Sequence, residues 1–239
     1  MATLTPQIGY PLKLSSGGAL QLNVIKLENH LIEQLSYNQT EASTLVNEIT
    51  SLVREDNKST LLSAGIKAPH LLNVILQSVD PSERLRFIQI QAGGADGLYD
   101  IARYHLETYR QILQSVSGDD ERLQLLQMKD RIGWTVLHFS VYLYVPKIVQ
   151  VILESVSEEM RYTLLSMEDN YKRTPIHIAC IVERSEVLEM MMRLITVEMR
   201  CKLLQLPAVL GYTPLHLSAL LDHTQCIRVI ADSVSSQQL

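Results

Sequence analysis

The sequence predicts an all-α fold, a helical-repeat solenoid, from three observations: a motif repeated at a fixed step, helix signals in each copy, and enough apolar residues to bury a core. The tetrapeptide Thr-Val-Leu-His at 135–138 recurs as Thr-Pro-Ile-His at 174–177 and as Thr-Pro-Leu-His at 213–216, and both steps are 39 residues. Leu-Leu pairs recur at the same step. Positions that stay in register over three copies indicate one structural unit repeated along the chain.

Each copy predicts a helix, a turn and a second helix, followed by a third, shorter helical segment. Thr174 and Thr213 can cap the first helix, because a threonine hydroxyl accepts from the free N–H groups of a first turn, and a proline follows each at the first helical position. The third segments, at 160–165 and 199–204, lengthen the unit. Apolar residues at spacings of three and four predict second helices that begin near Pro146, Ser185 and Thr224.

The repeated motif, with a small residue such as Ala179 shortly after it, resembles the signature of the ankyrin repeat family. Residues 130–135, Asp-Arg-Ile-Gly-Trp-Thr, look like the turn that precedes the signature in that family. The usual unit has about 33 residues, so a 39-residue step implies roughly six extra residues, which fall around the third segment. The sequence departs from the family pattern at Val136 (for Pro), Lys172 (for Gly) and Ala208 (for Asp).

The resemblance divides the chain into an N-terminal segment at 1–54 and a repeat array at 55–239. In the first part we expect an extended or mobile stretch over 1–18 and a helical cap with helices over 19–35 and 40–54. The expected units of the array are degenerate ones at 55–93 and 94–129, clear ones at 130–168 and 169–207, and an incomplete one at 208–239.

The last unit stops before its Leu-Leu pair, although its second helix keeps an apolar face. A terminal repeat normally carries a polar outer face. This predicts that the chain is part of a longer array, or that its open end docks on another subunit; a true terminus with a frayed last helix is the alternative.

Composition excludes several classes of function. Among 239 residues, 21 Lys and Arg stand against 26 Asp and Glu, and the formal net charge of −5 argues against a nucleic-acid groove. Three cysteines are too few for a disulfide framework and predict a reducing compartment, the cytoplasm, with the nucleus left open. No apolar stretch reaches the roughly 18 residues of a membrane span, so we expect no membrane insertion.

Three histidines at the repeat step, His138, His177 and His216, are candidates for a metal site. Equivalent atoms of stacked helices lie about 10 Å apart, whereas zinc–nitrogen bonds are about 2 Å long. We therefore expect no metal and no cofactor. The family resemblance implies instead that each histidine ties one turn to the next by hydrogen bonds.

His177 and Cys180, three residues apart on one helix, are the candidates for catalysis. A nucleophilic cysteine also needs a third group and an oxyanion site, and the sequence supplies neither nearby. A free cysteine usually behaves as a small buried apolar residue. We expect a protein that is not an enzyme, and an enzyme or ligand-binding protein that uses this Cys/His pair is the alternative.

The ankyrin resemblance implies a concave face lined by the turn tips and by the solvent edge of each first helix. A purely solvated face would be rich in Lys and Glu, whereas the residues that map here include the only Trp, three Tyr, two Arg and eight aliphatic residues. Such residues anchor protein interfaces. The predicted function is a scaffold or adaptor that binds a protein partner; the alternative is that some of these residues pack within the array or under the N-terminal helices. The candidate residues are Arg131, Ile132, Trp134, Tyr142, Leu143, Asn170, Tyr171, Arg173, Ile181, Val182, Val209, Leu210, Tyr212, Leu220 and Leu221.

Two of these expectations concern single residues. Trp134 and Tyr171 are each expected to be an exposed anchor, so that truncating either to Ala weakens binding by about 2 kcal/mol or more and changes stability far less. Leu215, at the apolar position of the motif, is expected to be buried, so that its truncation to Ala costs about 2–5 kcal/mol.

Overall fold

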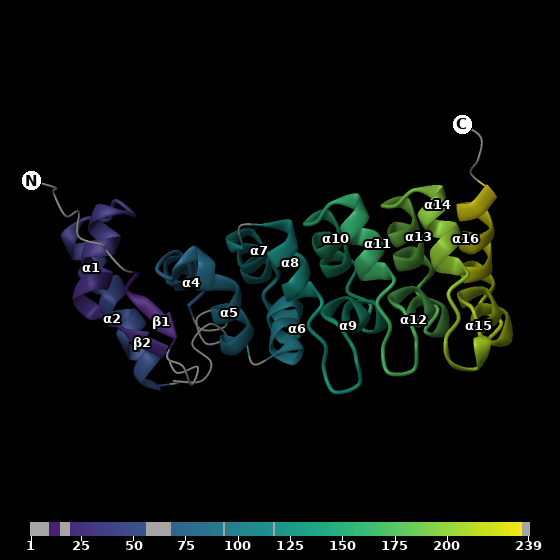
Figure 1. Cartoon of the computed structure of the whole chain (residues 1–239), viewed down its shortest axis with the longest axis horizontal. Helices are drawn as coiled ribbons and strands as arrows, with labels where there is room; N and C mark the ends of the chain where they lie inside the picture. Colours follow the sequence, from purple (N-terminus) through teal and green to yellow (C-terminus); the bar gives the residue numbers. More distant parts are fainter. Residues whose placement is uncertain (1–9, 15–19, 56–67, 93, 117, 236–239) are drawn as a thin grey trace, which may run out of the picture. The chain divides into compact units, whose positions relative to one another are not determined.

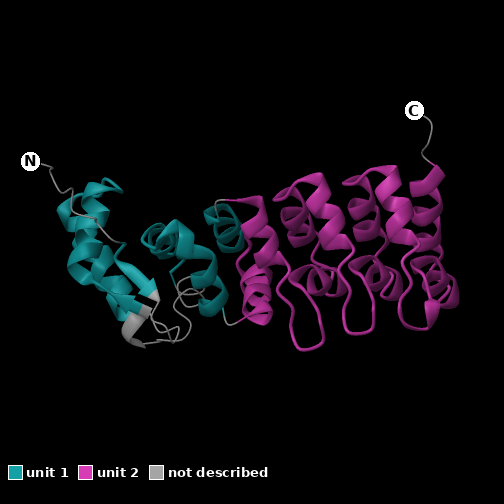
Figure 2. Cartoon of the chain, viewed as in Figure 1, with its two compact units in different colours: residues 1–93, 107–117 teal, residues 94–106, 118–239 magenta. Residues whose placement is uncertain are grey.

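The structure is a computed structural model that describes residues 10–14, 20–55, 68–92, 94–116 and 118–235 (Figure 1). Most of the described residues are helical, which confirms the predicted all-α class. The chain divides into two compact units, residues 1–93 with 107–117 and residues 94–106 with 118–239 (Figure 2). None of the described helices is long and apolar enough to cross a membrane. All the candidate binding residues belong to the second unit.

The first unit begins with a small sheet where the sequence predicts a helix over 19–35. Strand β1 (Leu12–Leu14) pairs antiparallel with β2 (Leu20–Leu22), and helix α1 (Val24–Glu33) begins only after Asn23, whose side chain accepts from a backbone N–H of the first turn. The apolar–polar–apolar alternation of β2 fits a strand. The predicted helix is therefore confirmed only from residue 24 onward.

Four more helices belong wholly or largely to this unit: α2 (Gln39–Glu55), α4 (Pro69–Gln77), α5 (Pro81–Gln91) and α7 (Leu106–Ser115). Helix α2 confirms the helix predicted over 40–54. The extended stretch predicted at 1–18 is described only at 10–14, and the predicted start of the first repeat unit, from 56 to 67, lies outside the described residues. The core of the unit contains Leu27, Leu31, Ile49, Leu72, Ile75, Phe87 and Tyr109.

The second unit repeats one order of helices. After α6 (Ala95–Tyr104) and α8 (Asp119–Leu126) come two sets of three helices and a final pair. The second helices begin at the residues that the sequence indicates, Pro146, Ser185 and Thr224. The sets are α9 (Val136–Tyr142), α10 (Pro146–Glu154) and α11 (Glu158–Leu165); α12 (Pro175–Ile181), α13 (Ser185–Arg193) and α14 (Val197–Leu204); and α15 (Pro214–Leu220) with α16 (Thr224–Ser235).

Equivalent helices of successive sets pack on each other (Figure 1). The first helices α6, α9, α12 and α15 contact in sequence, as do the second helices α10, α13 and α16 and the third helices α8, α11 and α14. Leu137 and Ile176, on α9 and α12, are fully buried by this packing. Leu215 occupies the same position on α15 and is 45% exposed, so the prediction that it is buried is wrong. Among the described residues no helix follows α16 that could cover it.

A row of arginines reinforces this packing, and the sequence analysis missed it. Arg84, Arg122, Arg161 and Arg200 follow one another at steps of 38, 39 and 39 residues. Within the second unit, Arg122 donates to the Ser155 carbonyl (2.8 Å), Arg161 to the Leu194 carbonyl (3.0 Å) and Arg200 to the Ser233 carbonyl (3.2 Å). These carbonyls lie at the ends of second helices, where backbone acceptors lack intrahelical donors and favour a cation. Each arginine thus joins one set of helices to the next.

Candidate protein-interaction surface

Three five-residue turns precede the first helices, and we call them together the turn row: residues 130–134, 169–173 and 208–212. Each turn closes in the same way, by a hydrogen bond from the N–H of its first residue to the carbonyl of its fifth, at 2.9, 2.9 and 2.8 Å. Ala208 replaces the aspartate of the other turns without changing this closure. The replacements at Lys172 and Ala208 therefore leave the closing hydrogen bond in place, although the backbone of the third turn differs at Leu210, which has a φ of +68°.

In the first two turns an aspartate holds the backbone. Asp130 Oδ1 accepts from the N–H groups of Ile132 (2.9 Å) and Trp134 (2.7 Å). Asp169 Oδ1 accepts from the N–H groups of Tyr171 and Arg173, both at 2.8 Å. An aspartate that bonds to the backbone a few residues ahead fixes a turn locally. Both carboxylates are therefore turned toward the backbone of their own turns.

Neighbouring turns are also bonded to each other. The Asn170 N–H donates to the Ile132 carbonyl and the Val209 N–H donates to the Tyr171 carbonyl, both at 3.1 Å. Gly133 has a φ of +83°, and a Cβ at this position would lie 2.7 Å from Asn170 Oδ1, so only glycine fits the close approach. The turn row is therefore one hydrogen-bonded strip rather than three independent loops.

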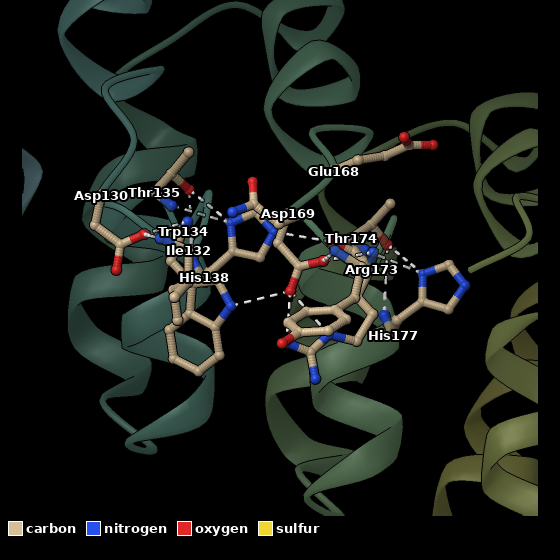
Figure 3. Close-up of polar contacts among 12 residues, drawn as sticks. Asp130, Ile132, Trp134, Thr135, His138, Glu168, Asp169, Arg173, Thr174 and His177 are labelled. Carbon is tan, nitrogen blue, oxygen red and sulfur yellow. Dashed lines mark hydrogen bonds and ion pairs between the residues drawn. The ribbon is translucent and has the colours of Figure 1, made fainter. Parts of the chain in front are cut away.

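Trp134 corrects the sequence prediction, because it is only 8% exposed. Its Nε1–H donates to Asp169 Oδ2 of the next turn at 3.0 Å (Figure 3). Its ring packs against Phe139 and Tyr142, with ring centroids 5.1 Å apart in both pairs. A tryptophan side chain is most stabilising when its ring is buried and its N–H donates to an acceptor. The prediction of an exposed anchor is wrong, and Trp134 joins two turns instead.

The carboxylate of Asp169 is fully buried and collects several donors. Arg173 donates to Asp169 Oδ2 through Nε (2.8 Å) and Nη2 (2.6 Å) (Figure 3). Burial alone would raise the pKa of Asp169, but hydrogen bonds from Arg173, Tyr171 and Trp134 outweigh it and lower the pKa. The charge of Arg173, which is half-buried, is therefore neutralised within its own turn.

The repeated histidines bond to the turns. Thr135 caps α9, and His138 Nδ1 accepts from the Thr135 N–H at 3.2 Å (Figure 3). Its Nε2 lies 3.1 Å from the Arg173 carbonyl, to which the neutral ring donates. This contact confirms the predicted bond between one turn and the next for His138. Burial lowers the pKa of His138 to about 4 and also lowers that of His177, so both rings are neutral near pH 7.

The residues considered for metal or thiol chemistry do not form a site in this arrangement. No cluster of three or more His, Cys, Asp or Glu that could hold a metal occurs in the described part of the chain. His177 Nδ1 is engaged by Thr174, 2.9 Å from its Oγ1. A hydrogen bond with Cys226 and burial raise the pKa of the Cys180 thiol. Cys180 is therefore a buried thiol, whereas a nucleophile requires the thiolate.

The remaining candidate residues reach the surface to different extents. Ile132, Tyr171 and Leu210, which we call the tip residues, hold the third position of each turn and are 44, 57 and 86% exposed. Arg173, Ile181 and Val182 are half-buried. The other candidates are exposed: Arg131, Tyr142, Leu143, Asn170, Val209, Tyr212, Leu220 and Leu221.

Tyr144 belongs to the same exposed surface and was missed by the sequence analysis. It directly follows the helix-end residues Tyr142 and Leu143 and is exposed. Its hydroxyl donates to the Glu186 carboxylate, and the Arg184 guanidinium lies 4.9 Å from its ring centroid. Its position, directly after two candidate residues, could have identified it from the sequence.

Comparison with models of known protein families finds none that matches the chain, and a search of curated proteins finds no matching relative. Function must therefore be inferred from the surface itself.

Proposed function

We propose that the chain is a non-enzymatic scaffold or adaptor, an ankyrin-type repeat array with lengthened units that binds a protein partner. The binding surface would be the turn row with the adjoining ends of the first helices, the concave face that the family resemblance implies. The 39-residue step, the helix order and the bonded turns support this assignment. Three free cysteines suit a reducing compartment, and we place the protein in the cytoplasm.

The observation that carries the proposal is the exposure of the three tip residues. A large apolar side chain stands at the same position of three bonded turns, and all three are exposed to solvent. Leu210 is the most exposed, and its φ of +68° places a non-glycine residue in the left-handed region, at a cost of about 1 kcal/mol or more. Nothing in its own turn offsets this cost by burial. Contiguous exposed apolar residues normally mark a binding surface.

The hydrogen bonds between turns suit such a role. A strip held by Asn170, Val209 and the aspartates is formed before any partner arrives. Binding to a pre-formed surface avoids most of the entropy cost of ordering loops. The proposed mechanism is thus recognition by a rigid, apolar and aromatic strip.

The alternative of a thiol-dependent enzyme has no supporting observation. Both His177 and Cys180 are fully buried, and the histidine Nδ1 is held by its own threonine. A raised thiol pKa opposes nucleophilic catalysis. We assign both residues to packing.

Site-specific photo-cross-linking tests the proposal. A benzophenone side chain replaces Tyr171 or Tyr142 on the proposed surface, or Tyr162 on α11 as the control, and each protein is irradiated in an extract of its natural cells. We expect the same adduct from the first two positions, none from Tyr162, and loss of the adduct when Ile132→Ser and Leu210→Ser are added. An equal adduct from Tyr162, or one that survives the two serines, would contradict the proposal.

A further inference from the structure

The exposed charged side chains of the turn row are cations. Asp169 is buried and bonds to backbone, Trp134 and Arg173, whereas Asp130 is half-buried and bonds to backbone N–H groups through Oδ1. Arg131 and Lys172, which stand beside the tip residues, are exposed. Within the described ranges neither forms an ion pair. The exposed charged side chains of the first two turns are therefore both cations, although the chain as a whole has a formal net charge of −5.

This charge is unevenly distributed along the strip. The first turn contributes Arg131 and the second contributes Lys172, whereas the third, with the sequence Ala-Val-Leu-Gly-Tyr at 208–212, has no ionisable group except the tyrosine. The third turn instead contributes Leu210, the most exposed of the tip residues. The strip thus runs from a cationic, apolar end to a purely apolar end.

We propose that the partner segment bound along the turn row is both acidic and apolar, with carboxylates facing Arg131 and Lys172 and an apolar side chain covering Leu210. The inference rests on the proposed function and adds the chemistry of the partner segment and its orientation along the turn row. Exposed cations without partners steer and orient an acidic ligand, since complementary charge sets encounter rate and register. The exposed apolar tips supply the burial that holds the ligand.

A protein segment fits this surface better than a nucleic acid. Phosphate backbones need a run of cations to release counterions, and the strip offers two such groups among apolar tips. Competition by a single-stranded oligonucleotide is therefore included as an outcome of the test.

A displayed library of random 12-residue peptides provides the probe. The intact chain selects binders, and peptides that also bind the Ile132→Ser/Tyr171→Ser/Leu210→Ser variant are discarded. The strongest peptides are synthesised with Glu and Asp, or with Gln and Asn at the same positions, and their affinities are measured by fluorescence anisotropy. Each is tested on the intact chain, on Arg131→Gln/Lys172→Gln, and on the control Lys147→Gln/Arg228→Gln, whose cations are exposed on α10 and α16.

We expect tip-dependent peptides rich in Asp and Glu, with the amide forms bound about tenfold more weakly, as the loss of two exposed ion pairs gives. That difference should vanish on Arg131→Gln/Lys172→Gln and persist on the control. Tip-dependent peptides without acidic residues, or displacement of the peptides by a 20-nucleotide DNA strand, would overturn the proposal that the partner segment is acidic. Neither result would contradict the assignment of the tip residues as a binding surface. A selection that yields no tip-dependent peptide would count against the proposed function itself.

Discussion

Replacing Trp134 with Phe should destabilise the protein, because the indole N–H is a donor to a fully buried carboxylate. The Nε1···Oδ2 distance to Asp169 is 3.0 Å, and Trp134 is 8% exposed. A hydrogen bond to a charged group contributes about 1.5–3 kcal/mol, and the smaller phenyl ring leaves additional unfilled space. We therefore expect a loss of about 2–4 kcal/mol in the free energy of unfolding, or at least about 4 °C in Tm.

Urea unfolding followed by circular dichroism at 222 nm measures this loss without relying on tryptophan fluorescence. Tyr171→Phe, an exposed aromatic residue of the neighbouring turn, is the matched control and should stay within about 0.5 kcal/mol of the parent protein. Asp169→Asn completes a double-mutant cycle, in which we expect a coupling of about 1 kcal/mol or more with Trp134. If Trp134→Phe unfolds like the control, the bond between the turns does not stabilise the fold and the reasoning fails.

Three further predictions concern other contacts. His138 has a pKa of about 4 in the folded protein and 6.5 in the unfolded chain, so its contribution to stability is full above pH 6.5 and falls by up to about 3 kcal/mol toward pH 4. Urea unfolding midpoints measured from pH 7.5 to 4.5 should fall less steeply with decreasing pH for His138→Gln than for the parent protein. Equal slopes would refute this prediction. Arg161→Met should lower the free energy of unfolding in urea by about 1.5–3 kcal/mol, whereas Arg193→Met, which removes one partner of an exposed ion pair, should lower it by under about 1 kcal/mol. A reversed order would contradict the stabilising role of the arginine row. In the same assay Ile176→Ala should lower the free energy of unfolding by about 2–5 kcal/mol and Leu215→Ala by under about 1 kcal/mol. Equal losses would show that both side chains are buried, contrary to the structure.

Much of the helical arrangement follows from local sequence signals. The second helices begin at the residues predicted, because apolar periodicity follows each of these positions directly. The strand at Leu20–Leu22 was missed, since three alternating residues look like part of the helix that follows them. Its pairing with Leu12–Leu14 is a contact between segments that no local pattern specifies. The burial of Leu215 was predicted wrongly because burial depends on a neighbouring helix rather than on the motif.

The candidate surface was predictable where it depends on turn position. Ile132, Tyr171 and Leu210 hold one position of a repeated turn, so the register alone suggested a shared surface. Trp134 was assigned wrongly because its environment includes Asp169, a residue 35 positions away whose carboxylate requires a donor. The arginine row was visible as a 39-residue spacing, but the helix-end carbonyls that bind it are backbone groups, which leave no trace in the sequence.

The role of the turn row is tested most directly by the affinity of a cross-linked partner, once purified, for the Ile132→Ser/Tyr171→Ser/Leu210→Ser variant. Titration calorimetry should show binding weakened at least about 30-fold, the factor that corresponds to loss of about 2 kcal/mol of anchoring contacts. Val24→Ser/Ile25→Ser, which removes exposed apolar residues from α1, should bind like the parent chain. Undiminished affinity of the triple variant, with an unchanged Tm, would contradict the assignment of this surface as the binding site.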